Sequence, residues 1–225
     1  GTEGVEMCIQ MAELDKNLGT LFDHLDAAGI DYVVVLSADH GGLDTPERSD
    51  EQAFPRAARA DKSLMPADLS KLVSARTGIT TKGPLLIADG PFGDFYVNRE
   101  LPADQRAVVV KALVSVVKGH PQVAAAYTAE ELAATPMPAG NPQDWTLRER
   151  ARASFDPSRS GDAVILLDRA ITPIPEPIPG MIIATHGSAF DYDRRVPMLF
   201  WRRGIHGFEQ PQPVETVDIA PTLAA

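Results

Sequence analysis

The sequence predicts an α/β fold with a mainly parallel central sheet flanked by helices, and with a small inserted α/β subdomain. Residues 31–36 form a short apolar run that follows an amphipathic segment and Gly29, as in a helix-to-strand unit. Residues 181–185 form a second apolar run, and such runs are typical of buried parallel strands. Strand-like and helix-like segments alternate between the two runs, which predicts the insertion.

Composition narrows the class of protein. The 225 residues are enough for one domain with a sizeable core, and 44% hydrophobic and 23% charged residues are typical of a globular protein. The formal net charge of −10 argues against non-specific nucleic-acid binding, which needs a basic surface. No apolar run approaches the about 20 residues that a membrane-spanning helix needs. We therefore expect no nucleic-acid partner and no membrane span.

The first helix is predicted over residues 2–28, where apolar side chains recur every three or four positions. This apolar stripe should be buried, with Cys8, the single cysteine, beside it as a small core residue. Gly29 should end the helix, and the strand follows. The polar stretch 43–59 contains two prolines and predicts a long loop with solvated acidic side chains.

The predicted subdomain begins after this loop. Glycine and proline separate its apolar segments, which predict helices over 67–76, 102–118 and 147–155 and strands over 83–89, 94–97, 123–127 and 161–167. Thr128 and Glu131 have the spacing of a capping box, so a short helix should begin there. This division assigns the core to residues 1–52 and 171–225 and the inserted subdomain to about 60–170.

The chain then returns to the core. Proline at every second position of 173–179 predicts an extended connector, because neither a helix nor a central strand accommodates that pattern. A strand is predicted over 181–185, a polar loop over 188–195 and another strand over 196–201. A final helix should begin near Val217.

The candidate functional residues lie where the two apolar runs end. Asp39 and His40 follow the first run and are followed by Gly41 and Gly42, while His186 follows the second. A carboxylate and imidazoles at the carboxyl ends of strands form a ligand set that suits zinc. The Asp-His pair alone is also compatible with a helix cap, a turn or an ordinary hydrogen-bonded pair. We assign no function to the other three histidines, His24, His120 and His206.

Several phrases together resemble the alkaline phosphatase superfamily. The relatives that the chain resembles most are bacterial zinc-dependent alkaline phosphatases related to type I phosphodiesterase/nucleotide pyrophosphatases. The resemblance extends from the first helix to the last residue. The phrases that carry it are Ser37-Ala38-Asp39-His40-Gly41, Thr185-His186-Gly187-Ser188, Asp191-Tyr192-Asp193, Val196-Pro197-Met198 and Thr216-Val217-Asp218-Ile219-Ala220-Pro221-Thr222-Leu223.

This resemblance implies an alkaline-phosphatase-like fold and a site with two zinc ions that hydrolyses phosphate monoesters through a phospho-threonine intermediate. It implies that Asp39 and His40 bind the zinc ion that also holds the nucleophile, and that His186 binds the other zinc ion. The expected substrates are small phosphate esters, and the expected location is periplasmic or secreted.

The resemblance assigns no catalytic residue to this chain. The family's nucleophilic threonine and its remaining ligands have no counterpart here, and the nucleophile is expected upstream of Gly1. The chain is therefore expected to be the C-terminal part of a catalytic domain, truncated at both ends and inactive by itself.

Three alternatives stay open. A phosphodiesterase/nucleotide pyrophosphatase of the same superfamily would share every motif found here. A sulfatase would share the fold but would usually hold one calcium ion with more carboxylates. A non-catalytic α/β module would use Asp39, His40 and His186 only as structural residues. The sequence leaves the oligomeric state open.

Overall fold

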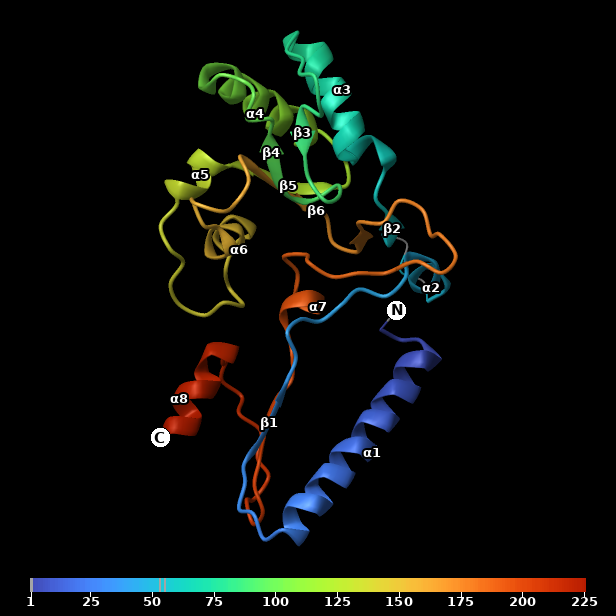
Figure 1. Cartoon of the computed structure of the whole chain (residues 1–225), viewed down its shortest axis with the longest axis vertical. Helices are drawn as coiled ribbons and strands as arrows, with labels where there is room; N and C mark the ends of the chain where they lie inside the picture. Colours follow the sequence, from blue (N-terminus) through green and yellow to red (C-terminus); the bar gives the residue numbers. More distant parts are fainter. Residues whose placement is uncertain (1, 53, 55) are drawn as a thin grey trace.

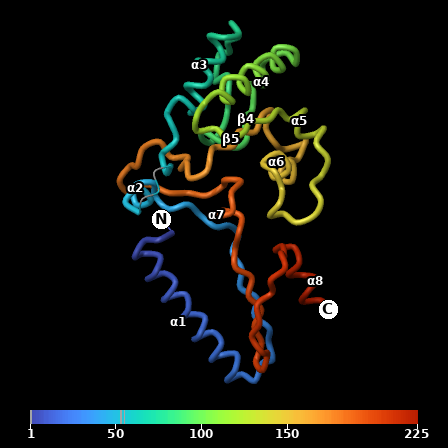
Figure 2. Tube along the Cα trace, turned by 180° about the vertical axis from the view of Figure 1, so that it is seen from behind, coloured from blue at the N-terminus to red at the C-terminus, as the bar shows by residue number. Residues whose placement is uncertain are grey.

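The computed structural model describes residues 2–52, 54 and 56–225 as an α/β protein with a compact upper lobe and an elongated lower part (Figure 1). Gly1 lies outside the described residues, and the nucleophile expected upstream of it stays a prediction. The lower part holds the long helix α1 (Val5–Ala27), a two-stranded ribbon of β1 (Val34–Ser37) and β8 (Met198–Trp201), and the short helix α8 (Ile219–Ala224). Seen from behind, α1 again approaches the ribbon only at its lower end, and α8 lies on the other side of the ribbon (Figure 2).

The α-helices are α1 (Val5–Ala27), α2 (Pro46–Glu51), α3 (Pro66–Thr77), α4 (Ala103–Val117), α5 (Ala129–Ala133), α6 (Leu147–Ser154), α7 (Asp191–Arg194) and α8 (Ile219–Ala224), with 3-10 helices η1 (Lys62–Leu64) and η2 (Thr216–Asp218). The strands are β1 (Val34–Ser37), β2 (Ala58–Arg59), β3 (Leu86–Ile87), β4 (Gly93–Val97), β5 (Val123–Thr128), β6 (Ala163–Leu167), β7 (Ile171–Thr172) and β8 (Met198–Trp201). Among the described helices, none is both long enough and apolar enough to cross a membrane.

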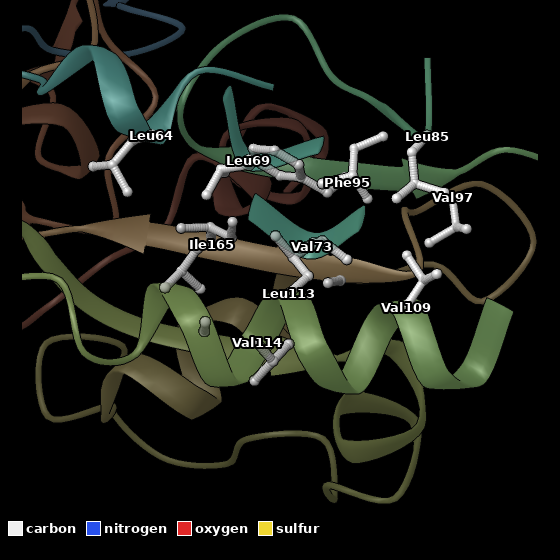
Figure 3. Close-up of a cluster of buried hydrophobic side chains, with 14 of the residues drawn as sticks. Leu64, Leu69, Val73, Leu85, Phe95, Val97, Val109, Leu113, Val114 and Ile165 are labelled. Carbon is white, nitrogen blue, oxygen red and sulfur yellow. The ribbon is translucent and has the colours of Figure 1, made fainter. Parts of the chain in front are cut away.

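The hydrophobic core lies in the upper lobe. Its sheet has the strand order β3-β4-β6-β5, and neighbouring strands are antiparallel. Alternate residues of β6 face opposite sides of the sheet. Ile165 packs into the main core with α3 and α4, whereas Val164 packs against the smaller cluster that includes Leu132 of α5 and Ala151 of α6. Figure 3 shows the main core gathered between helices and sheet.

Most local predictions for this lobe are confirmed. The expected strands 83–89 and 94–97 form the antiparallel hairpin β3–β4, and the expected helices become α3, α4 and α6. The capping box is present: the Glu131 amide donates to Thr128 Oγ1 at 3.1 Å, and the Thr128 amide donates to Glu131 Oε2 at 2.8 Å. Local side-chain chemistry therefore determines these elements.

Three expectations for the lower part differ from the structure. Strand β1 pairs antiparallel with β8 and is half-exposed, and the parallel pair among the described strands is β2–β7. Residues 181–185 form no strand, and none of them is buried. The stretch 43–59 contains α2 and β2 as well as loop, since Pro46 begins a helix at its first turn.

The apolar stripe of α1 is also not buried. None of its described residues is buried, and Cys8 is exposed rather than in a core. The helix is held near its C-terminal end, where the Phe22 ring stacks on Tyr32 and Trp201 with centroid distances of 5.8 Å. No other described element covers the stripe, so periodicity identified the helix correctly but not its surroundings.

A part-buried ion pair between Asp44 and Arg48 anchors the chain just beyond Gly42. Asp44 is 6% exposed and accepts hydrogen bonds from Arg48 Nη1 at 3.0 Å and from the Thr45 amide at 2.7 Å. Burial raises the pKa of the Asp44 carboxyl, but these hydrogen bonds outweigh burial and hold the pKa below its ordinary value of 3.8. The expected solvated acidic residue is therefore a structural one.

This lowered pKa predicts a loss of stability in acid. The contribution of Asp44 to the free energy of unfolding should be complete above about pH 4 and should disappear as the pH falls through the lowered pKa, because only the ionised carboxylate is stabilised. Asp44→Asn should cost about 1.5–3 kcal/mol at neutral pH, and the cost should shrink in acid. Urea unfolding between neutral pH and pH 2 measures it, with exposed Asp50→Asn as control. If the loss of stability in Asp44→Asn did not change with pH, the ionised Asp44 carboxylate would not be the stabilising group.

Candidate metal site

Asp39 and His40 lie just beyond the end of β1, as the sequence predicts. The Asp39 side chain is 89% exposed and that of His40 is 40% exposed, so both are open to a ligand. The His40 amide donates to Asp39 Oδ1 at 3.1 Å, which fixes the backbone between them. His40 Nε2 lies 3.7 Å from Asp39 Oδ2.

The His40 ring is oriented by its own turn. His40 Nδ1 lies 2.6 Å from the Gly41 carbonyl oxygen, which can only accept, so Nδ1 carries the proton and donates. The other ring nitrogen, Nε2, is turned toward the Asp39 carboxylate, so it is the nitrogen that remains for a ligand. Backbone carbonyls commonly orient metal-binding histidines in this way.

His186 joins this pair from the other end of the chain. Its ring stacks on the His40 ring with a centroid distance of 3.4 Å and an interplanar angle of 12°. The segment before it is held by Arg59 rather than by a strand: Arg59 Nη1 donates to the carbonyl oxygens of Ile174 at 3.0 Å and Ile183 at 3.1 Å. The structure therefore brings Asp39, His40 and His186 to one place.

Gly187 allows the turn that follows His186. Its φ is +108°, a region that residues with a Cβ rarely adopt, and a Cβ there would lie 3.0 Å from the Phe92 ring. Phe92 belongs to the turn between β3 and β4, so the upper lobe contacts the His186 turn directly. This contact explains why glycine follows the histidine.

The three residues fit a metal in part. Two ligands of one zinc ion, each about 2.0–2.2 Å from it, are necessarily less than about 4.4 Å apart, and the 3.7 Å between His40 Nε2 and Asp39 Oδ2 satisfies this limit. Among residues 2–52, 54 and 56–225, no three His, Cys, Asp or Glu side chains are grouped to hold one ion. The arrangement therefore suits Asp39 and His40 as a pair of ligands for one ion, with His186 as a ligand for another. Their role as metal ligands stays a prediction.

Sequence reasoning assigned Asp193 no functional role, although the residue lies in one of the phrases that carry the family resemblance, and the structure places it in contact with both histidine turns. Its backbone carbonyl accepts from the Gly41 amide at 2.7 Å, and its Oδ2 accepts from the Ser188 amide at 2.7 Å. The sequence placed it in a polar loop, where the structure instead forms α7 and buries Asp193. The position of Asp193, an acidic residue close to the apolar run of β8, was a sequence feature that pointed to it. Its contacts are revealed by the fold alone.

The comparisons with known proteins agree on one group. Residues 1–189 match the family model described as type I phosphodiesterase/nucleotide pyrophosphatase. The whole chain is 51% identical to alkaline phosphatase PhoD of Zymomonas mobilis subsp. mobilis and 51% identical to alkaline phosphatase PhoK of a Sphingomonas species. It spans 39% and 40% of those two proteins, or about two fifths of the length of each.

A solved structure has the same fold. The crystal structure of wild-type alkaline phosphatase PafA superposes with a TM-score of 0.74 at 24% sequence identity, covering 94% of this chain and 38% of that chain. In sequence, alkaline phosphatase PafA of Elizabethkingia meningoseptica is 25% identical over 236 residues, which cover this chain fully and 39% of the relative. The expected α/β class and alkaline-phosphatase-like fold are thus confirmed.

Proposed function

The chain belongs to the type I phosphodiesterase/nucleotide pyrophosphatase family, within the alkaline phosphatase superfamily, and from this premise we propose that the whole protein is a zinc-dependent hydrolase of phosphate monoesters. The observation that carries the proposal is the stacking of His40 on His186 beside Asp39, residues that come from segments more than a hundred positions apart. Its substrates would be small phosphate esters.

Each of the three side chains has a role in this proposal. Asp39 and His40 would bind one zinc ion, with the Gly41 carbonyl holding the His40 ring so that Nε2 faces the metal. His186 would bind the second. When bound, two zinc ions supply the positive charge that offsets the negative phosphate and its leaving oxygen. The nucleophile in this proposal is a threonine upstream of Gly1, which would form a phospho-threonine intermediate.

We also propose that the residues corresponding to the predicted core, 1–52 and 171–225, carry this site, and that the inserted subdomain of about 60–170 supports it. The Phe92–Gly187 contact supports that role, since it joins the two parts. On the same resemblance we place the whole protein in the periplasm or outside the cell, which fractionation of producing cells would test.

The test begins with metal removal. The whole protein, treated with a chelator and dialysed, should lose hydrolysis of p-nitrophenyl phosphate and regain it with Zn²⁺ but not with Ca²⁺. Restoration by Ca²⁺ alone would instead favour sulfatase-like chemistry, and p-nitrophenyl sulfate would then be the substrate to try. Activity that survives complete metal removal would refute the proposal.

The family description favours a second candidate, a phosphodiesterase or nucleotide pyrophosphatase. Rates with bis-p-nitrophenyl phosphate and p-nitrophenyl phosphate distinguish it, because a monoesterase should hydrolyse the monoester faster. The 225-residue chain by itself should bind zinc and hydrolyse neither substrate above background, since the proposed nucleophile lies outside it. Turnover by this chain would show that the nucleophile is wrongly placed.

A further inference from the structure

Asp193 is hydrogen-bonded to both turns that carry the candidate histidines. On one side, the Gly41 amide donates to the Asp193 carbonyl at 2.7 Å, and the Gly42 amide donates to the neighbouring Tyr192 carbonyl at 2.9 Å. On the other side, the Ser188 amide donates to Asp193 Oδ2 at 2.7 Å. One residue therefore holds the backbone just after His40 and two positions after His186.

Asp193 is buried where it joins the two turns. The residue is 6% exposed, and its Oδ1 is buried without a hydrogen-bond partner among the residues that the structure describes. A buried carboxylate is costly unless it makes strong hydrogen bonds, so its bond to Ser188 should be retained firmly. Asp193 also lines a small cavity of about 20 Å³ together with His186, Ser188 and Phe92.

Gly41 shows how closely the two turns approach. A Cβ at this position would overlap the Tyr192 carbonyl oxygen, so only glycine permits the hydrogen bonds to Tyr192 and Asp193. Tyr192 is held in turn, because its hydroxyl oxygen accepts from the Ala170 amide at 3.2 Å. The α7 segment is thus fixed on both sides, and the His40 turn is fixed against it.

We infer that Asp193 is a positioning residue that holds the His40 and His186 turns at their mutual distance, its backbone fixing the first turn and its carboxylate the second. Its importance for catalysis rests on the proposed function, but the positioning itself requires neither metal nor substrate. The stacked imidazoles, 3.4 Å apart, are the feature that this link should preserve.

Asp191 offers a matched control. It lies on the same helix, and its carboxylate is 3.6 Å from Arg150 and 3.7 Å from Arg194, without a hydrogen bond to either histidine turn in the described part of the chain. Asp191→Ala therefore removes a charge of the same sign from α7 and leaves the link intact. Asp193→Asn keeps an oxygen that can accept from the Ser188 amide.

The test uses the metal-free protein with labelled histidines. A nuclear Overhauser effect between the His40 and His186 rings should be present in the wild type, in Asp191→Ala and in Asp193→Asn, and should be lost in Asp193→Ala. Retention of this effect in Asp193→Ala, or its equal loss in Asp191→Ala, would overturn the inference. Should Asp193→Ala fail to fold, hydrogen exchange in the wild type decides: the Ser188, Gly41 and Gly42 amides should all exchange slowly, and rapid exchange at Ser188 would overturn it.

A second measurement connects the link to the metal. Asp193→Ala should weaken zinc binding about 10–100-fold in a chelator competition, the usual cost of losing a residue that orients a ligand, whereas Asp191→Ala should leave it unchanged. Unaltered zinc affinity in Asp193→Ala would count against positioning. If the wild-type protein had no phosphatase activity, the proposed function would be refuted. The contact between the His40 and His186 rings and the slow exchange of the Ser188, Gly41 and Gly42 amides would still decide whether Asp193 is a positioning residue.

Discussion

Replacing His40 by alanine should reduce zinc affinity by more than about 100-fold and should abolish phosphatase activity in the whole protein. This loss of affinity exceeds the about 10–100-fold cost of losing a residue that only orients a metal ligand. The change removes the one imidazole nitrogen that faces Asp39, and Asp39 is too exposed to hold a cation by itself. Calorimetric titration of the metal-free protein with Zn²⁺ measures the affinity, and p-nitrophenyl phosphate measures the activity.

Two further variants make this result specific. His186→Ala should remove activity while leaving one zinc ion bound, because Asp39 and His40 would remain. His24→Ala should change neither quantity, since His24 lies on α1 and its Nδ1 donates to the Thr20 carbonyl within that helix. If His40→Ala still bound two zinc ions as tightly as the wild type, Asp39 and His40 would be structural residues and the metal assignment would fail.

Much of this site could be predicted from the sequence, because it depends on short local phrases. The pair Asp39-His40 and the single residue His186 each follow an apolar run and precede glycine, and the structure brings the three side chains close to one another. Asp193 could not be predicted in the same way. Its importance comes from contacts with residues five and more than a hundred and fifty positions away, which no local pattern records.

The fold shows the same difference between features set by local sequence and features set by distant contacts. In the upper lobe each segment finds its partner within the described chain, so periodicity and capping residues predicted the elements well. In the lower part the pattern of α1 and of residues 181–185 predicted burial, yet Met181 is 66% exposed and α1 has no buried residue. An apolar face shows that a segment can pack against another element, but it does not identify that element.

Phe95→Ala should destabilise the upper lobe by about 3–5 kcal/mol, the usual cost of removing a fully buried aromatic ring. Phe95 is 0% exposed on β4 and lies among labelled core residues such as Leu69 and Val97 (Figure 3). The surroundings should not collapse to fill the space, because β4 is paired on both sides by β3 and β6. The lost contacts and the remaining cavity should therefore both contribute.

Urea unfolding of Phe95→Ala measures this cost. Phe208→Ala is the matched control: Phe208 is 81% exposed, so its replacement should change stability by less than about 0.5 kcal/mol. The Phe95 variant should also loosen the β3–β4 turn that carries Phe92, which contacts Gly187 beside His186. Zinc affinity should then fall along with stability in Phe95→Ala but not in Phe208→Ala. A fall in stability without any change in zinc affinity would mean that the His186 turn is positioned by α7 alone, independently of the upper lobe.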